Sequence, residues 1–148
     1  MMRKLFLTAL LTTLPYAAFA CKLSAEATDL TAFLMAKNES QVVFLGKVKS
    51  VQALPRTSNE TNQDITFEAS KWWRGTPQNL VLALGAEDTM AGTDCAGIFD
   101  FSAQEGEQWL VVGTWWNGKI NPSGLLSMRL QNGNLPAEIK GQLDRVSE

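Results

Sequence analysis

The stretch Gln41-Val42-Val43-Phe44-Leu45-Gly46-Lys47-Val48 has the clearest structural pattern in the chain. Its apolar residues first run consecutively and then alternate with lysines, which is typical of a strand whose first half is buried on both faces. We expect this strand to span residues 41–54. Because glycine in a strand interior weakens regular pairing, the glycine at its centre predicts a bulge or a tight bend.

The segments that follow predict four more strands. Apolar alternation indicates strands at residues 64–71, 80–84 and 106–115, and a shorter one at 125–130. Residues 55–62 are polar and predict a hairpin loop, and the sequence Trp-Trp-Arg-Gly at 72–75 predicts a turn. Asn117-Gly118 is typical of a tight hairpin turn. The long polar segment 85–97, centred on Cys95, predicts a loop of the functional or disordered kind.

The sequences before and after these strands predict helices. Ser24 suits a helix N-cap, and one helix ending near residue 38 is indicated by apolar residues at helical spacing, Leu30, Phe33 and Leu34. Pro136 suits a helix start, and an amphipathic C-terminal helix is indicated by Ile139, Leu143 and Val146. Five short strands with flanking helices favour a mainly β fold, a closed five-stranded Greek-key barrel, with an open sandwich as the alternative.

The first twenty residues have the pattern of an export signal. Arg3 and Lys4 precede an apolar run at 5–14 that is too short to span a bilayer, and Ala18-Phe19-Ala20 matches a cleavage site. We expect a signal peptide at 1–20, a single domain at 21–148 and a periplasmic or secreted protein. The alternative is a lipoprotein anchored at Cys21, although the leucine that usually opens such a cleavage box is replaced by Ala18.

Composition restricts the function. The chain has 13 Lys and Arg and 15 Asp and Glu; loss of the signal removes Arg3 and Lys4, which leaves a formal charge of −4. This charge argues against a nucleic-acid partner, which favours a basic face. The chain has no histidine, so histidine-based acid–base catalysis is impossible. We expect no enzymatic activity, no cofactor and a monomer.

Cys21 and Cys95 are the only cysteines, and in an exported protein they are most simply a disulfide. Such a bond would attach the mature N-terminus to the loop at 85–97. The plainest role for it is to hold a chain end that would otherwise fray.

The ordered motifs of the mature chain resemble the netrin-type domain shared with tissue inhibitors of metalloproteinases. They are Cys21, the short helix, Val43-Phe44-Leu45-Gly46-Lys47-Val48, Trp73-Arg74-Gly75, Asp94-Cys95-Ala96-Gly97 and Gly106-Glu107-Gln108-Trp109-Leu110-Val111-Val112. The resemblance implies an OB-fold barrel. It also implies that the α-amino nitrogen and carbonyl oxygen of Cys21 chelate the catalytic zinc of a metalloprotease.

The same resemblance assigns a role to the residues around Cys21. Lys22 would enter the pocket beside the zinc, and the surrounding contact surface would comprise Leu23, Ser24 and the loop at 91–96, with Thr93, Asp94, Cys95 and Ala96. The chain departs from the inhibitors because Leu23 replaces the second cysteine of their Cys-x-Cys start, and because Lys22 replaces a small hydroxyl residue. The isolated chain itself is expected to hold no metal.

Two tryptophan pairs indicate a different binding surface. Successive strand residues face opposite ways, so one member of Trp72-Trp73 and one of Trp115-Trp116 should point away from the core. Trp73 and Trp116 are therefore candidates for binding an envelope protein or a carbohydrate without inhibiting a protease. The alternative is that these tryptophans cap the core beneath the helices.

Overall fold

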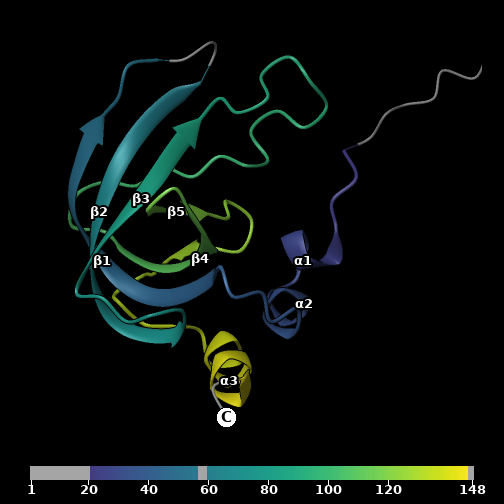
Figure 1. Ribbon diagram of the computed structural model, residues 1–148, viewed down its shortest axis with the longest axis vertical. Helices are drawn as coiled ribbons and strands as arrows, with labels where there is room; N and C mark the ends of the chain where they lie inside the picture. Colours follow the sequence, from purple (N-terminus) through teal and green to yellow (C-terminus); the bar gives the residue numbers. More distant parts are fainter. Residues whose placement is uncertain (1–20, 57–59, 147–148) are drawn as a thin grey trace, which may run out of the picture.

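The computed structural model describes residues 21–56 and 60–146, so the expected signal segment at 1–20 lies outside the described residues. The fold is mainly β, and Figure 1 shows its strands curving around one another with short helices outside them. In chain order the elements are α1 (Ala25–Thr28), α2 (Leu30–Met35), β1 (Gln41–Ala53), β2 (Thr61–Arg74), β3 (Leu80–Glu87), β4 (Gln108–Trp116), β5 (Lys119–Pro122), β6 (Met128–Arg129) and α3 (Ala137–Val146).

The first five strands close into a barrel, which confirms the expected fold class. The strand order is β1-β2-β3-β5-β4, and β4 pairs back with β1. All pairings are antiparallel except that of β3 with β5, which is parallel and consists of Ala83 with Ile120. β6 pairs only with β4 and lies outside the closed ring. This is the strand order of an OB-type Greek-key barrel with a weakly joined seam between β3 and β5.

Gly46 allows β1 to bend around the barrel, as the sequence predicted. The register of β1 against β2 shifts between Leu45 and Gly46, which marks a bulge. A Cβ at this glycine would lie 2.9 Å from Phe44 Cε2 and 3.2 Å from Phe67 Cβ. Since those two rings pack edge to face inside the barrel, the missing side chain makes their contact possible.

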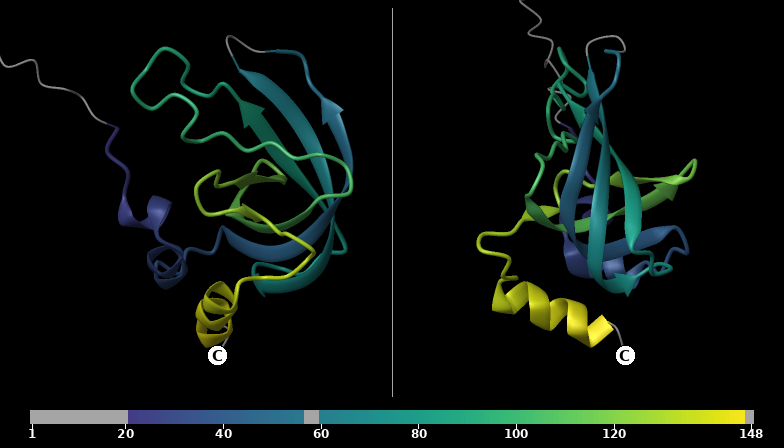
Figure 2. Two further views of the ribbon diagram at one scale, coloured as in Figure 1. Left: turned by 180° about the vertical axis from the view of Figure 1, so that it is seen from behind. Right: turned by 90° about the vertical axis from the view of Figure 1, so that its left-hand side faces the viewer.

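Two apolar clusters bury the first half of β1 on both faces, as expected. Val42 and Phe44 belong to the cluster inside the barrel, whereas Val43 belongs to a cluster outside it. The outer cluster includes α2 and Leu143 of α3. Figures 1 and 2 show α3 lying across one end of the barrel beside α2, so the predicted amphipathic C-terminal helix is confirmed.

The prediction that residues 125–130 form the last strand of the barrel was wrong. Asn117 and Gly118 both have positive φ and form the expected tight turn, which sends the chain directly back as β5. Ile120 of β5 is fully buried in the inner cluster and closes the barrel. Within 125–130, only Met128–Arg129 forms a strand, and it pairs with the outer part of β4.

Three predicted boundaries also need correction. The single N-terminal helix is two helices, because Asp29 adopts an extended conformation and its carboxylate caps α2 by accepting from Ala32 N at 2.7 Å. The predicted turn at 72–75 begins only at Gly75, since β2 continues through both tryptophans to Arg74. β3 continues to Glu87 because its end pairs with the start of β2, so the following loop begins later than predicted, at Asp88, and it extends to the start of β4 at Gln108.

Candidate functional site

The candidate site is built on a disulfide between Cys21 and Cys95, whose Cα atoms lie 5.2 Å apart and which are 74 residues apart in sequence. The bond places Cys21 beside Cys95, and we call residues 21–24 and 93–96 together the ridge. Figure 1 shows the loop between β3 and β4 at the end of the barrel away from α3, close to the N-terminal segment. The disulfide expected from the cysteine count is therefore present and is consistent with an oxidising environment.

The ridge is exposed but held at both ends of its N-terminal segment. Cys21 and Leu23 are half-buried, whereas Lys22 and Ser24 are exposed. The disulfide holds one end, and Ser24 holds the other by capping α1, with its Oγ accepting from Ala27 N at 3.3 Å. The main chain between these two attachments is thus fixed at the surface.

The second segment of the ridge is shaped by local hydrogen bonds. Thr93 Oγ1 donates to Met90 O at 2.8 Å and accepts from Cys95 N at 3.2 Å. Thr93, Asp94 and Ala96 are exposed, and Cys95 is half-buried. The structure therefore joins the two segments at Cys21 and Cys95, and the ridge residues around both cysteines are exposed or half-buried.

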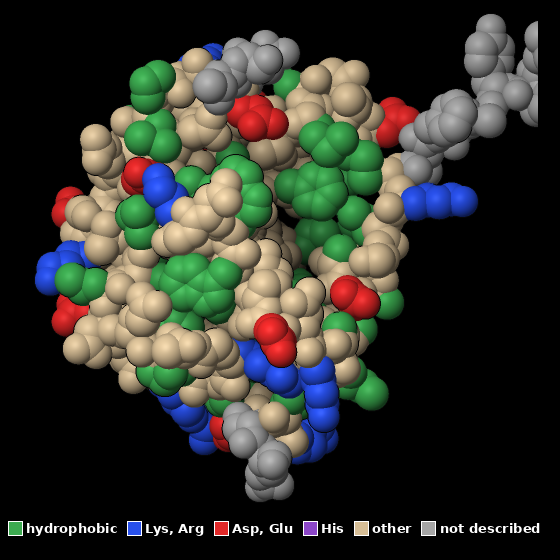
Figure 3. Space-filling view, viewed as in Figure 1, with side chains coloured by type: hydrophobic (Ala, Val, Ile, Leu, Met, Phe, Trp, Pro, Cys, Tyr) green, Lys and Arg blue, Asp and Glu red, His purple; other side chains and the backbone are tan. Residues whose placement is uncertain are grey.

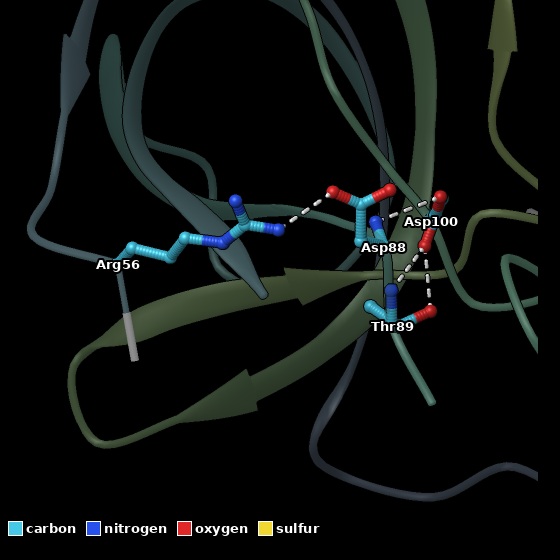
Figure 4. Close-up of polar contacts among 4 residues, drawn as sticks. All are labelled: Arg56, Asp88, Thr89 and Asp100. Carbon is cyan, nitrogen blue, oxygen red and sulfur yellow. Dashed lines mark hydrogen bonds and ion pairs between the residues drawn. The ribbon is translucent and has the colours of Figure 1, made fainter. Parts of the chain in front are cut away.

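Asp100 organises the base of this loop (Figure 4). Its Oδ1 accepts from Thr89 Oγ1 at 2.6 Å and from Thr89 N at 2.9 Å, and its Oδ2 accepts from Asp88 N at 3.2 Å. Thr89 is 7% exposed, so its hydroxyl and backbone N–H are buried, and both donate to Asp100. Arg56 joins the β1–β2 connection to the same loop through Asp88 at 3.3 Å.

The pKa of Asp100 reflects this arrangement. Partial burial alone would raise it, but the hydrogen bonds from the Thr89 hydroxyl, Thr89 N–H and Asp88 N–H outweigh burial and hold the pKa below its ordinary value. The carboxylate therefore stays ionised and keeps the loop in place at neutral pH. Sequence reasoning missed this pair because Thr89 and Asp100 lie eleven residues apart in an irregular segment without periodicity.

The two tryptophan candidates occupy different environments. Trp116 is 59% exposed, while its neighbour Trp115 packs against the inner cluster. Trp73 points away from the barrel interior but packs under α3, where its indole donates to Asp144 Oδ1 at 3.2 Å. That hydrogen bond lowers the pKa of Asp144, helped by Lys71 and Lys140 and opposed by partial burial. Trp116 is therefore the more accessible of the two.

Residues 21–56 and 60–146 contain no cluster of three His, Cys, Asp or Glu side chains placed to hold a metal ion. Within the same ranges, every helix is too short or too polar to cross a bilayer. A search against known protein-family models finds no match. A search of curated protein sequences likewise finds none.

Proposed function

We propose that the mature protein is a netrin-like, metalloprotease-inhibitor module that acts through the main chain of Cys21. The observation that supports this proposal is the disulfide that fixes a half-exposed Cys21 beside the exposed loop at 93–96. A catalytic zinc keeps one coordination position open for water or substrate. The α-amino nitrogen and carbonyl oxygen of a terminal Cys21 would occupy that position and displace the attacking water.

The ridge has the physical properties that such an inhibitor requires. A segment held at both ends loses little conformational entropy on binding, and this increases affinity. The Asp100–Thr89 hydrogen bonds give the neighbouring loop similar support. No peptide bond of the inhibitor needs to lie in a cleavable position, because the chelating atoms belong to the chain end.

The chelating amine must be neutral. An α-amino group has a reference pKa of about 7.7 to 8.0, so a substantial neutral fraction exists near neutral pH. Inhibition should therefore weaken as the pH falls below this range, because the protonated amine has no lone pair for zinc. Lys22, which is exposed next to Cys21, would favour a protease whose adjacent pocket carries negative charge.

The proposal includes export and removal of residues 1–20, because only cleavage before Cys21 creates the chelating amine. The intact mass of protein purified from its native host tests this step directly. We expect a mass that begins at Cys21, with both cysteines alkylated only after reduction. A mass increased by acyl chains would show a lipoprotein and would overturn the chelation mechanism.

Inhibition is tested by titrating the mature protein against zinc metalloproteases of several families. One alanine added before Cys21 should abolish inhibition, because it moves the amine away from the disulfide. The matched control is one alanine added after Glu148, which should leave inhibition unchanged. Equal inhibition by the extended form, or no inhibition of any protease by protein with a free Cys21 amine, would refute the proposed function.

A further inference from the structure

A groove of about 670 Å³ lies at the seam between β3 and β5, and neither ridge cysteine is among the residues that line it. Its apolar lining includes Leu54, Leu84, Phe99, Phe101, Trp116 and Pro122. Three polar residues, Glu60, Asn62 and Asn121, also line it. We call it the seam groove.

The groove follows from the way the barrel closes. β3 and β5 are joined by one residue pair, Ala83 with Ile120, and beyond it β3 turns to pair through Ala86 with Phe101. The two strands diverge between these points, so the lining residues Leu84 and Asn121 border a depression instead of a continuous sheet. The groove also adjoins the β1–β2 connection and the β4–β5 hairpin, which are the loops that OB-type barrels use for oligonucleotides and oligosaccharides.

Trp116 is presented to this groove by a fixed hairpin. It pairs with Lys119 across the tight turn, and Lys119 Nζ binds both carboxylate oxygens of Asp64 on β2 at 2.7 and 2.9 Å. Both of those charged side chains are partly buried. The indole is thus held on a braced element while remaining 59% exposed, which suits a stacking platform.

The charges around the groove favour a neutral ligand. Glu60 lines the groove, Glu87 is the last residue of β3 and Asp88 follows it, whereas Arg56 is paired with Asp88. A phosphate or sulfate group would meet net negative charge here, and the mature chain is itself acidic. Of the two ligand classes that these loops bind in OB-type barrels, this charge disfavours nucleic acids and favours neutral oligosaccharides.

A second hollow of about 300 Å³ extends the groove toward α1. The two share Phe99, Asn121 and Pro122, and the second is bordered by Ala27 and Phe33. Figure 3 shows apolar side chains gathered beside a hollow between the barrel and the N-terminal segment. The volumes of the two hollows, about 670 and 300 Å³, leave room for more than one sugar ring.

We propose that the seam groove binds a neutral oligosaccharide. One pyranose ring places its C–H face against the Trp116 indole, while its hydroxyl groups hydrogen-bond with the Asn121 amide and the Glu60 carboxylate. Phe99, which is 43% exposed, borders the path of the next ring toward α1. This site is independent of the protease-inhibiting function, since it uses neither the amine nor the sulfur of Cys21.

The test is an NMR titration of the mature protein with cellotetraose, maltotetraose and chitotetraose at millimolar concentration. A sulfated heparin tetrasaccharide serves as the anionic control. The indole N–H signals of Trp72, Trp73 and Trp109 are internal references, because none of these residues lines the groove or the second hollow and each donates to a protein acceptor. The Trp116 signal is identified as the one that Trp116→Phe removes.

We expect at least one neutral tetrasaccharide to shift the Trp116 signal while the reference signals stay in place. Trp116→Ala should weaken binding about tenfold, and Trp116→Phe should retain part of it. Met35→Ala, at a 70% exposed position on α2, is the matched control and should bind normally. An alanine added before Cys21 should also leave sugar binding intact.

Three results would overturn the proposal. They are a Trp116 signal that none of the neutral tetrasaccharides shifts, an equal response to the sulfated sugar, and wild-type affinity in a folded Trp116→Ala variant. Thermal unfolding of each variant checks the fold. Because this substitution removes an exposed side chain outside both apolar clusters, we expect little change in stability.

Discussion

Removal of the Cys21–Cys95 disulfide by the double substitution Cys21→Ser and Cys95→Ser is the most informative perturbation of this fold. The bond joins residues 74 positions apart, and loop-closure entropy for a loop of that size gives an upper value of about 4.5 kcal/mol. Neither cysteine belongs to an apolar cluster, and α1 has no buried residue. Residues 21–24 would therefore regain freedom in the folded variant, which offsets part of the loss.

We expect the double variant to remain a folded barrel and to lose about 2 to 4 kcal/mol of unfolding free energy. Urea denaturation followed by tryptophan fluorescence measures this loss. Wild-type protein with reductant should match the variant, and reductant should not affect the variant further. A loss below about 1 kcal/mol, or a variant without folded structure, would refute the reasoning. The variant should also lose protease inhibition while the Trp116 site remains.

Three other substitutions test the packing and the loop. Leu143→Ala should lower the unfolding free energy, measured with denaturant, by about 2 to 5 kcal/mol, because the side chain of Leu143 on α3 is fully buried in the outer cluster. A loss below about 1 kcal/mol would mean that the packing of α3 contributes little to stability. Gly141→Ala should stabilise the protein by about 0.5 to 1 kcal/mol, since a Cβ there meets no atom within 4 Å and alanine favours the helix. Asp100→Asn should destabilise by about 1 to 2 kcal/mol near neutral pH, because its amide would face the Asp88 N–H donor. The pKa of Asp100 is lowered in the folded state, so the stability that its carboxylate contributes is present above the unfolded pKa and is lost as the pH falls through the folded pKa. The difference in unfolding free energy between wild type and Asp100→Asn should therefore shrink in acid. A difference that stays constant with pH would contradict this account.

The sequence alone determined the features that depend on neighbouring residues. The doubly buried first half of β1, the bulge at Gly46 and the turn at Asn117-Gly118 all follow from short-range patterns of apolar side chains and glycine. Ser24 and the apolar spacing after Pro136 likewise identified a helix start and a helix face. The two cysteines left a single possible intramolecular disulfide, so that bond required no knowledge of the fold.

Tertiary structure decided the features that depend on residues distant in sequence. β5 is only four residues long, and it closes the barrel because Ile120 meets a core built by other strands; a segment so short carries little periodicity of its own. The Thr89–Asp100 hydrogen bonds and the seam groove likewise arise where separate segments converge. Local sequence encodes backbone preference, whereas the closing strand, the supported loop and the groove depend on which surfaces meet after the barrel has formed.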